Sequence, residues 1–362
     1  MILTRGARVT GAVLCAVLAV VVASWLVRDA RAAETGQLLR YWAGFYDARP
    51  KAMPATSVID VALLVVYAAA AVAVLRSSVA ATALVATGVV TLAVRLPGLW
   101  NLGGSWAQSA FGDTLRTRAL VSAFVALAVG IALLIVAGAG RRPPAGSYEQ
   151  LPTRSGQGAA VASFLLLGAA AAVLAAWDIR QVVRLPEIFP EWYVGGDRIP
   201  QGAIDPPPGW GTAALVLFCA VAAVSALFRA VHARPFGLVA AALLLPGGVL
   251  GIFRAVHYDM LDHFGSLGTE TQLMVASWFF QASAAAVVLL ALAPRGFADV
   301  PGPYGGPYGP DQGPGYGPPG YGPPGRAPDL YPGQQPPASG YGYPQGGGFG
   351  PPPPPSQPPP GW

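Results

Sequence analysis

The sequence predicts an all-α integral membrane protein of about eight transmembrane helices, arranged as two parallel four-helix repeats and followed by a disordered C-terminal tail. Hydrophobic residues make up 54% of the chain and charged residues only 11%, whereas a soluble domain carries about 25% charge. Eight apolar stretches have roughly the length that a bilayer requires. The last 66 residues hold 22 of the 37 prolines, which separates a tail from the membrane part.

Eight segments qualify or nearly qualify as spans, because each holds roughly 20 mostly apolar residues. They are expected to be helices, since lipid offers no partner to a free backbone N–H or C=O group. Cys15 and Cys219 fall inside two of them, where packing is expected rather than a disulfide. The predicted spans are 9–27, 57–75, 79–96, 118–138, 159–177, 212–231, 236–254 and 272–293.

The first span also has features of a cleaved signal peptide. Arg5 and Arg8 precede it, and Ala30-Arg31-Ala32 forms an A-x-A pattern. Its apolar core is longer than the roughly 7–15 residues of a signal sequence. We therefore expect it to be retained as a true span.

Weak matches recur between the two halves of the chain at offsets of 150 to 159 residues. An even number of helices in each half would give both the same orientation, as in a parallel repeat. The predicted domains are a first repeat (1–141), a cytoplasmic linker (142–158), a second repeat (159–296) and the tail (297–362). The matched positions are Trp25 and Arg28 with Trp177 and Arg180, Trp42 and Asp47 with Trp192 and Asp197, Leu75-Arg76 with Phe228-Arg229, Thr87-Gly88 with Pro246-Gly247, Arg95 with Arg254, and Arg141 with Arg295.

The placement of arginines predicts that both termini are cytoplasmic. Short segments on the side of the N-terminus are dense in arginine close to the span ends, which is typical of cytoplasmic loops. The loops on the opposite side carry more basic residues in total, but they are much longer. We expect a multi-pass protein of the plasma membrane.

Three polar residues lie within spans or at their edges. Ser57-Val-Ile-Asp60 has the form of a helix capping box, although an acid in a membrane helix is also a candidate for binding an ion or proton. Tyr67 and Gln281 are expected to form hydrogen bonds across helix interfaces. The capping role is the favoured interpretation of Asp60, with ligand binding as the alternative.

Arg95 and Arg254 end the third and seventh spans at matching positions. A cation at a helix C-terminus is favoured by the helix dipole, and its side chain can reach the headgroups. The alternative is a pseudo-symmetric pair that binds an anionic ligand. With Asp60, these two residues form the candidate ligand site.

Glycine and proline occur at corresponding places in those same two spans, as Thr87-Gly88 and Pro246-Gly-Gly248. Matching interruptions in two halves are a pointer to a transport site. Glycine is also common where membrane helices pack closely. Packing is the favoured interpretation, and a broken helix the alternative.

A polar stretch after the seventh span gathers His257, Asp259, Asp262 and His263. Imidazole and carboxylate groups suit zinc or a similar ion. A polar loop at the membrane surface explains the same residues without a metal. We expect the loop and keep the metal site as the alternative.

No catalytic motif for a nucleotide, a nucleophilic serine or a bound metal stands out, so no catalytic residue and no cofactor are predicted. The net charge of +5 comes from arginines that flank spans, which does not favour nucleic-acid binding. The lipid bilayer is the expected partner, and an oligomer is compatible with the sequence.

The tail repeats Pro-Tyr-Gly and Gly-Tyr-Gly-Pro-Pro units and ends in proline runs. Such a composition cannot form a packed core, and polyproline segments are ligands for aromatic grooves. In its PGPYGGPYGP and GYGPPGYGPPG runs the chain resembles uncharacterised actinobacterial multi-span membrane proteins with Pro/Gly/Tyr-rich cytoplasmic tails. We expect a non-enzymatic envelope protein whose tail recruits or clusters cytoplasmic proteins. The alternative is a permease, channel or lipid-handling protein with a site between the repeats.

Overall fold

The computed structural model describes residues 2–143, 153–199, 201–294 and 297–298. Residues 299–362 of the tail, most of the predicted linker and Arg295 lie outside these residues. Eight helices are long and apolar enough to span a membrane, which confirms the predicted number within the described part of the chain. They are α1 (Arg5–Ala33), α3 (Val58–Arg76), α4 (Ala80–Arg95, continued by α5, Gly98–Asn101), α7 (Asp113–Ala139), α8 (Gln157–Arg184), α10 (Pro208–Leu227), α11 (Ala233–His257) and α12 (Thr269–Leu292).

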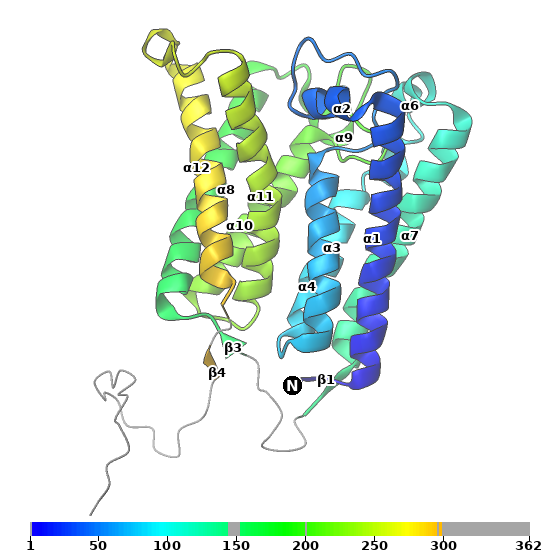
Figure 1. Cartoon of the computed structure of the whole chain (residues 1–362), viewed down its shortest axis with the longest axis vertical. Coiled ribbons are helices and arrows are strands. Elements are labelled where there is room, and N and C mark those ends of the chain that lie inside the picture. The colour runs from blue at the N-terminus through cyan, green and yellow to red at the C-terminus, as the bar shows by residue number, and fades with distance from the viewer. Residues whose placement is uncertain (1, 144–152, 200, 295–296, 299–362) are drawn as a thin grey trace, which may run out of the picture. The chain divides into compact units, whose positions relative to one another are not determined.

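The two ends of the long helices differ in the short elements that lie there (Figure 1). Three short helices and a 3-10 turn lie at one end, which we call the loop end: α2 (Thr35–Trp42), α6 (Ser105–Ala110), α9 (Phe189–Val194) and Phe264–Ser266. Four two-residue strands lie at the opposite end, which we call the terminal end: β1 (Ile2–Leu3), β2 (Arg141–Arg142), β3 (Thr153–Arg154) and β4 (Phe297–Ala298).

The apolar windows of the sequence do not mark the ends of several helices correctly. The fifth predicted span ends at residue 177, but α8 continues to Arg184. The sixth was placed at 212–231, whereas α10 begins at Pro208 and ends at Leu227. Proline suits the first helical position because its missing N–H group has no partner there. Hydropathy therefore marks the apolar part of each helix rather than its ends.

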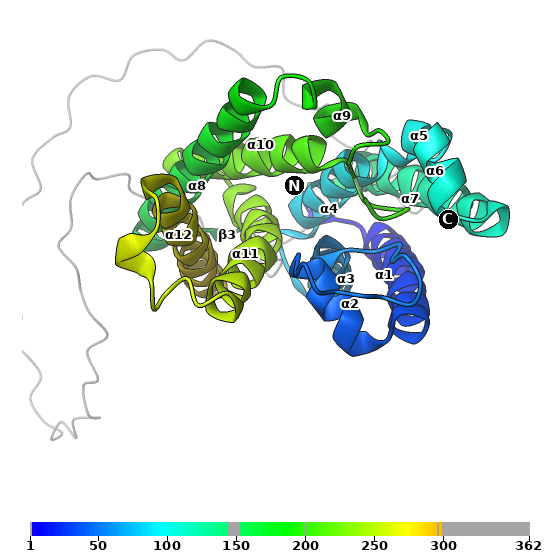
Figure 2. The same cartoon turned by 90° about the horizontal axis from the view of Figure 1, so that it is seen from above.

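The long helices form two bundles of four (Figure 2). In the first half, α1 packs on α3, α3 on α4, α4 on α7, and α7 on α1. In the second half, α8, α10, α11 and α12 pack in the same cyclic order. The halves meet where α11 contacts α3 and α4, and where α10 contacts α4.

Each half is closed by a short antiparallel ladder between its own two ends. Strand β1 precedes α1 and pairs with β2, which follows α7. Strand β3 precedes α8 and pairs with β4, which follows α12. The first and last helices of each bundle are thereby tied at the terminal end.

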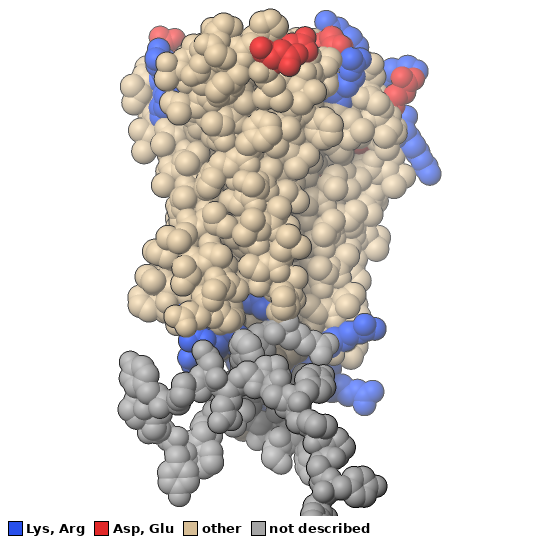
Figure 3. Space-filling view, turned by 60° about the vertical axis from the view of Figure 1, so that its left-hand side comes forward, with Lys and Arg blue, Asp and Glu red and all other residues tan. Residues whose placement is uncertain are grey.

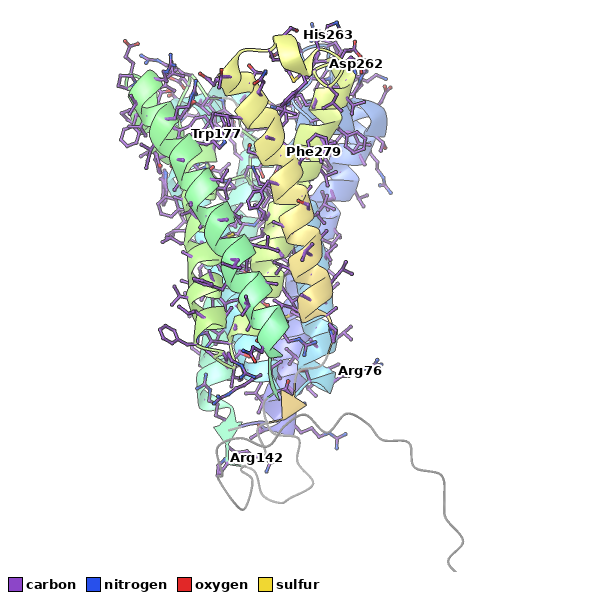
Figure 4. All side chains as sticks on the ribbon, turned by 90° about the vertical axis from the view of Figure 1, so that its left-hand side faces the viewer. Arg76, Arg142, Trp177, Asp262, His263 and Phe279 are labelled. Atoms are coloured by element: carbon purple, nitrogen blue, oxygen red, sulfur yellow. The ribbon has the colours of Figure 1, made fainter. Side chains whose placement is uncertain are left out.

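Charge differs between the two ends. On the face that Figure 3 shows, basic and acidic residues lie together at the loop end, basic residues lie at the terminal end, and the belt between them is largely uncharged. Arg76 and Arg142 lie there, whereas Asp262 and His263 lie at the loop end (Figure 4). In the described residues, the terminal segments carry no acid; their arginines are Arg5, Arg8, Arg76, Arg141, Arg142, Arg154, Arg229 and Arg234.

Helices α4 and α11 run without interruption through their glycines and proline, which agrees with the favoured packing interpretation and contradicts the alternative of a broken helix. The glycines serve close packing instead. A Cβ on Gly88 would lie 2.9 Å from the carbonyl oxygen of Gly130 in α7, and one on Gly248 would lie 2.5 Å from the amide nitrogen of Ala282 in α12. Backbone atoms of the neighbouring helices occupy that space, so a larger residue at either position would require a shift. Cys15 and Cys219 are free and buried, as predicted.

Candidate functional site

Asp60 caps α3, as the sequence predicted. Its Oδ2 accepts a hydrogen bond from the Ser57 N–H at 3.0 Å, and the Ser57 Oγ accepts one from the Ile59 N–H at 3.2 Å. This is the capping box of α3. The other carboxylate oxygen of Asp60 points elsewhere and is free for a second role.

That second role is an ion pair with Arg95 at the end of α4. The side chain of Arg95 is 5% exposed and that of Asp60 is 1% exposed. Nη2 of Arg95 donates to Oδ1 of Asp60, and Nη1 donates to the carbonyl oxygen of Ile204 at 2.7 Å. Because the guanidinium is buried and already has an anionic partner, an anionic ligand would have to displace Asp60.

Hydroxyl groups extend this cluster into the bundle. Thr91 donates a hydrogen bond to the Tyr67 hydroxyl at 3.0 Å, which confirms the expected bond between helices for Tyr67. Tyr67 and Arg95 also line a small cavity with Trp25 and Ser122. The cavity offers about 20 Å³ to the centre of a water molecule, enough for one water.

The cover of this cluster comes from the second half. Residues 201–207, which we call the crossover segment, lie between α9 and α10. The Ile204 N–H donates to the Ala55 carbonyl at 3.0 Å. A Cβ on Gly202 would lie 2.6 Å from that same oxygen, so only glycine fits there. Ala203 and Ile204 are buried against Trp25 and Leu102 of the first half.

The crossover segment also brings in Asp205. Its Oδ1 is sealed from solvent and has no hydrogen-bond partner. Burial raises the pKa of Asp205 well above its usual value, and the charge of Asp60 raises it further, against the opposing effects of Ser57 and Arg95. We call Asp60, Tyr67, Thr91, Arg95 and Asp205 the Arg95 cluster.

Arg254 occupies the matching position in the second half but has different surroundings. It is half-buried; its Nε donates to the Ala43 carbonyl at 2.9 Å, and its guanidinium lies 5.5 Å from the centre of the Trp278 ring. Gly44 has a φ of +71°, and a Cβ there would lie 2.6 Å from Nη2 of Arg254. Arg95 and Arg254 thus lie in separate environments and do not form one anion site.

The histidine-rich turn does not gather metal ligands. His257 stacks on Phe45 of the first half at 4.0 Å between ring centres, and its Nε2 lies 4.0 Å from Oδ1 of Asp47. His263 turns back toward the backbone carbonyl of Asp259. Among the described residues, no three His, Cys, Asp or Glu side chains lie close enough to hold a metal ion.

Two acids that the sequence analysis did not single out organise the loop end. Asp29 in α1 is fully buried; its Oδ2 accepts bonds from the Ala55 N–H, the Thr56 N–H and the Thr56 hydroxyl, each at 2.7 Å. Asp178 in α8 accepts bonds from the Trp192 indole and the Tyr193 hydroxyl. Both acids follow a Trp near the end of the first helix of their half, and that pattern was the available signal.

An apolar groove lies at the seam between the halves, where α4 lies beside α10 (Figure 2). It has a volume of about 290 Å³ and almost no polar lining. Leu217 and Val221 on its wall are 65% and 46% exposed. We call it the seam groove; it is lined by Val89, Ala93, Trp210, Ala213, Ala214, Leu217, Phe218, Val221 and Phe236.

An aromatic pair marks the loop end of the seam groove. The Trp210 indole N–H donates to the Ala93 carbonyl at 2.7 Å, and its ring packs edge-on against Trp100 with the ring centres 5.5 Å apart. Trp100 in turn donates to the Val194 carbonyl at 2.9 Å. The groove therefore begins beneath two fixed indoles.

Comparison with protein-family models, with curated proteins and with solved structures finds no match to this chain. Its function has to be argued from its own residues.

Proposed function

We propose that this chain is a lipid-binding protein of a plasma membrane, with eight spans in two like-oriented halves and a terminal end that faces the cytoplasm. The observation that carries the proposal is the seam groove, an apolar surface hollow of about 290 Å³ where the halves meet. Two of its lining residues, Leu217 and Val221, are exposed on α10, a helix that is apolar enough to span a membrane. In a bilayer, such a hollow is filled by hydrocarbon.

The dimensions of the groove favour a single acyl chain. Its lining runs along α10 from Trp210 to Val221, and eleven residues of helix extend about 16 Å. The hydrocarbon core of a bilayer is about 30 Å thick, so the groove matches one leaflet. Trp100 and Trp210 at its mouth suit the headgroup depth of that leaflet, where Trp side chains are enriched.

The arginines support the orientation. Membrane proteins carry an excess of Lys and Arg in their cytoplasmic segments. The terminal segments hold eight arginines and, in the described residues, no acid. Reporter fusions after residues 145 and 300 are expected to be cytoplasmic, and one after residue 195 external. An external reporter at residue 145 would contradict this orientation.

The shared packing order and the two closing ladders support duplication of a four-helix unit. In each half the residues before the first helix pair with those after the fourth. An even number of helices makes two such units parallel. On this proposal the seam groove lies between repeats, the location expected for a ligand site in the lipid-handling alternative.

Photo-crosslinking tests the groove. The full chain is reconstituted with a phosphatidylglycerol that carries a photoactivatable group near the end of one acyl chain, and crosslinked peptides are mapped. We expect crosslinks on α4 and α10, and a several-fold loss of them in Ala214→Trp, which fills the groove. Leu290→Trp is the matched control, because Leu290 is 74% exposed on α12 and does not line the groove.

Crosslinks spread evenly around the belt, or an Ala214→Trp result equal to the control, would overturn lipid binding in the groove.

The recruiting role of residues 297–362 is a separate proposal, supported by their seven tyrosines and 22 prolines. Affinity pull-downs with and without those residues test it, and an unchanged set of partners would count against it.

A further inference from the structure

The Arg95 cluster contains more buried acid than base. Asp60 and Asp205 face one arginine, which already donates to Asp60 and to the Ile204 carbonyl. Two carboxyl groups in contact cannot both ionise readily, because the negative charge on one raises the free energy of ionising the other. The excess negative charge has to be removed by a bound cation or by a proton.

Asp205 is the member that lacks compensation. Asp60 has two donors, the Ser57 N–H and Arg95. Asp205 has a sealed Oδ1 without a partner, and the Asp60 carboxyl lies within hydrogen-bond reach of its side chain. A carboxylic acid at position 205 could donate one hydrogen bond, whereas a carboxylate could only accept.

None of the remaining groups around Asp205 supplies a second positive charge to compensate the two acids. Tyr41 of α2 lies close enough for the Asp205 charge to raise its pKa, after burial, which acts more strongly. Ser57 offers a hydroxyl. Asp29 already accepts hydrogen bonds from the N–H groups of residues 55 and 56, and Nη1 of Arg28 lies 2.5 Å from its Oδ1. No second cation faces Asp205 among the described residues.

We propose that Asp60 and Asp205 form a proton-binding site between the two halves, in which the proton stays on Asp205 and Arg95 compensates the charge of Asp60. The site forms where the crossover segment of the second half, which carries Asp205, covers Asp60 and Arg95 of the first half. Loss of the proton leaves a buried, uncompensated carboxylate, so it favours lifting of that segment. Proton binding is thereby coupled to closure of the loop end, on the external side in the proposed orientation.

The sign of the pH dependence follows from the raised pKa of Asp205. With the segment lifted, Asp205 regains an ordinary pKa of about 3.9. The closed form therefore holds its proton to higher pH than the lifted form, and closure weakens as pH rises from the ordinary value to the raised one. Above the raised value the effect is complete and levels off.

Two measurements on the full chain in lipid discs test the site. The first is infrared difference spectroscopy, in which the band of a protonated carboxylic acid is expected to persist above the ordinary pKa of an aspartic acid and to be lost in Asp205→Asn. Asp197→Asn is the matched control, because Asp197 precedes the crossover segment, where it accepts a bond from exposed Ser105. A band that survives Asp205→Asn would overturn the proposal.

The second measurement is thiol labelling of Ala203→Cys in a chain whose native cysteines are replaced by alanine. Ala203 is 3% exposed, so a thiol there reacts only when the segment lifts. We expect the opening equilibrium to rise by up to about tenfold per pH unit between the two pKa values, and to be flat when Asp205→Asn is added. Identical pH profiles with and without Asp205→Asn would contradict the coupling.

Asp205→Asn and Asp205→Ser both place a neutral side chain where the proposal places a neutral acid. At least one is expected to fold, and failure of both while Asp197→Asn folds would overturn the proposal. Sodium-dependent protection of Ala203→Cys without a carboxylic acid band would also overturn it, by assigning the site to a metal cation. None of these readouts depends on the seam groove, so the two proposals stand or fall separately.

Discussion

The loop end of each half contains an arginine at the same helix position, but the two arginines differ in burial and in partners. Arg95 and Arg254 both occupy the last turn of the third long helix of their half. Arg95 is 5% exposed and paired with a buried acid, whereas Arg254 is half-buried and contacts a carbonyl and an indole. Their positions in the helix are alike, and the segments that cover them differ.

The covering segments explain the difference. Arg95 lies beneath the crossover segment, whose Ile204 and Asp205 come from the other half. Arg254 is met by the turn at Ala43 and Gly44, also from the other half. Each half thus contributes a loop to the arginine of its neighbour, but only the crossover segment closes over a capped acid. The crossover segment of the second half thereby helps to bury a charged pair that lies within the first half.

The largest expected effect is on the buried ion pair. Arg95→Met leaves Asp60 buried without its cation, which costs about 3–5 kcal/mol. Arg254→Met removes one hydrogen bond and a cation–π contact, which together cost about 1–2 kcal/mol. Reversible unfolding of both variants in mixed micelles, compared with the unchanged chain, measures the difference. Equal losses would show that the two arginines have equivalent environments in solution.

A second comparison concerns the glycines of α11. Gly248→Ala places a methyl group against the backbone of Ala282, and such overpacking costs about 1–3 kcal/mol. Gly247→Ala is the matched control, because the nearest atom to its Cβ is the Gln281 Oε1 at 3.8 Å. We expect the control to be neutral or slightly stabilising, since alanine favours helix more than glycine does. A neutral Gly248→Ala would mean that α11 and α12 pack less closely than described.

The smallest expected effect separates a buried hydroxyl from an exposed one. Tyr67→Phe leaves the buried Thr91 hydroxyl without its cross-helix partner and costs about 1 kcal/mol. Tyr258→Phe removes an acceptor for the exposed Tyr46 N–H, where water replaces it, and is expected to cost less than about 0.5 kcal/mol. The same unfolding measurement ranks the pair. A larger loss at Tyr258 would place more of the stability in the contact between halves than in the first bundle.

The sequence was sufficient wherever the deciding information is local. Span number follows from runs of apolar residues whose length is set by the bilayer. The capping box follows from Ser57 and Asp60, three residues apart. The like packing of the halves agrees with the ordered matches in the sequence, although duplication itself stays a proposal. At Gly88 and Pro246-Gly-Gly248 the favoured packing interpretation is confirmed, and the alternative of a broken helix is wrong because α4 and α11 are continuous there.

Only the tertiary structure decided which polar groups meet. Asp205 lies 110 residues after Arg95 and joins it through a loop of the other half, which no periodicity or spacing can indicate. The local signal in the sequence was Pro206–Pro208, because a proline favours an extended conformation for the residue before it. That signal does not indicate which helix the crossover segment covers. Likewise, a metal site at His257 was only the alternative to a polar loop, and the stacking of His257 on Phe45 of the other half was visible only in the fold. Short-range patterns set the helices of this protein, and contacts between distant segments set the charge and burial of its sites.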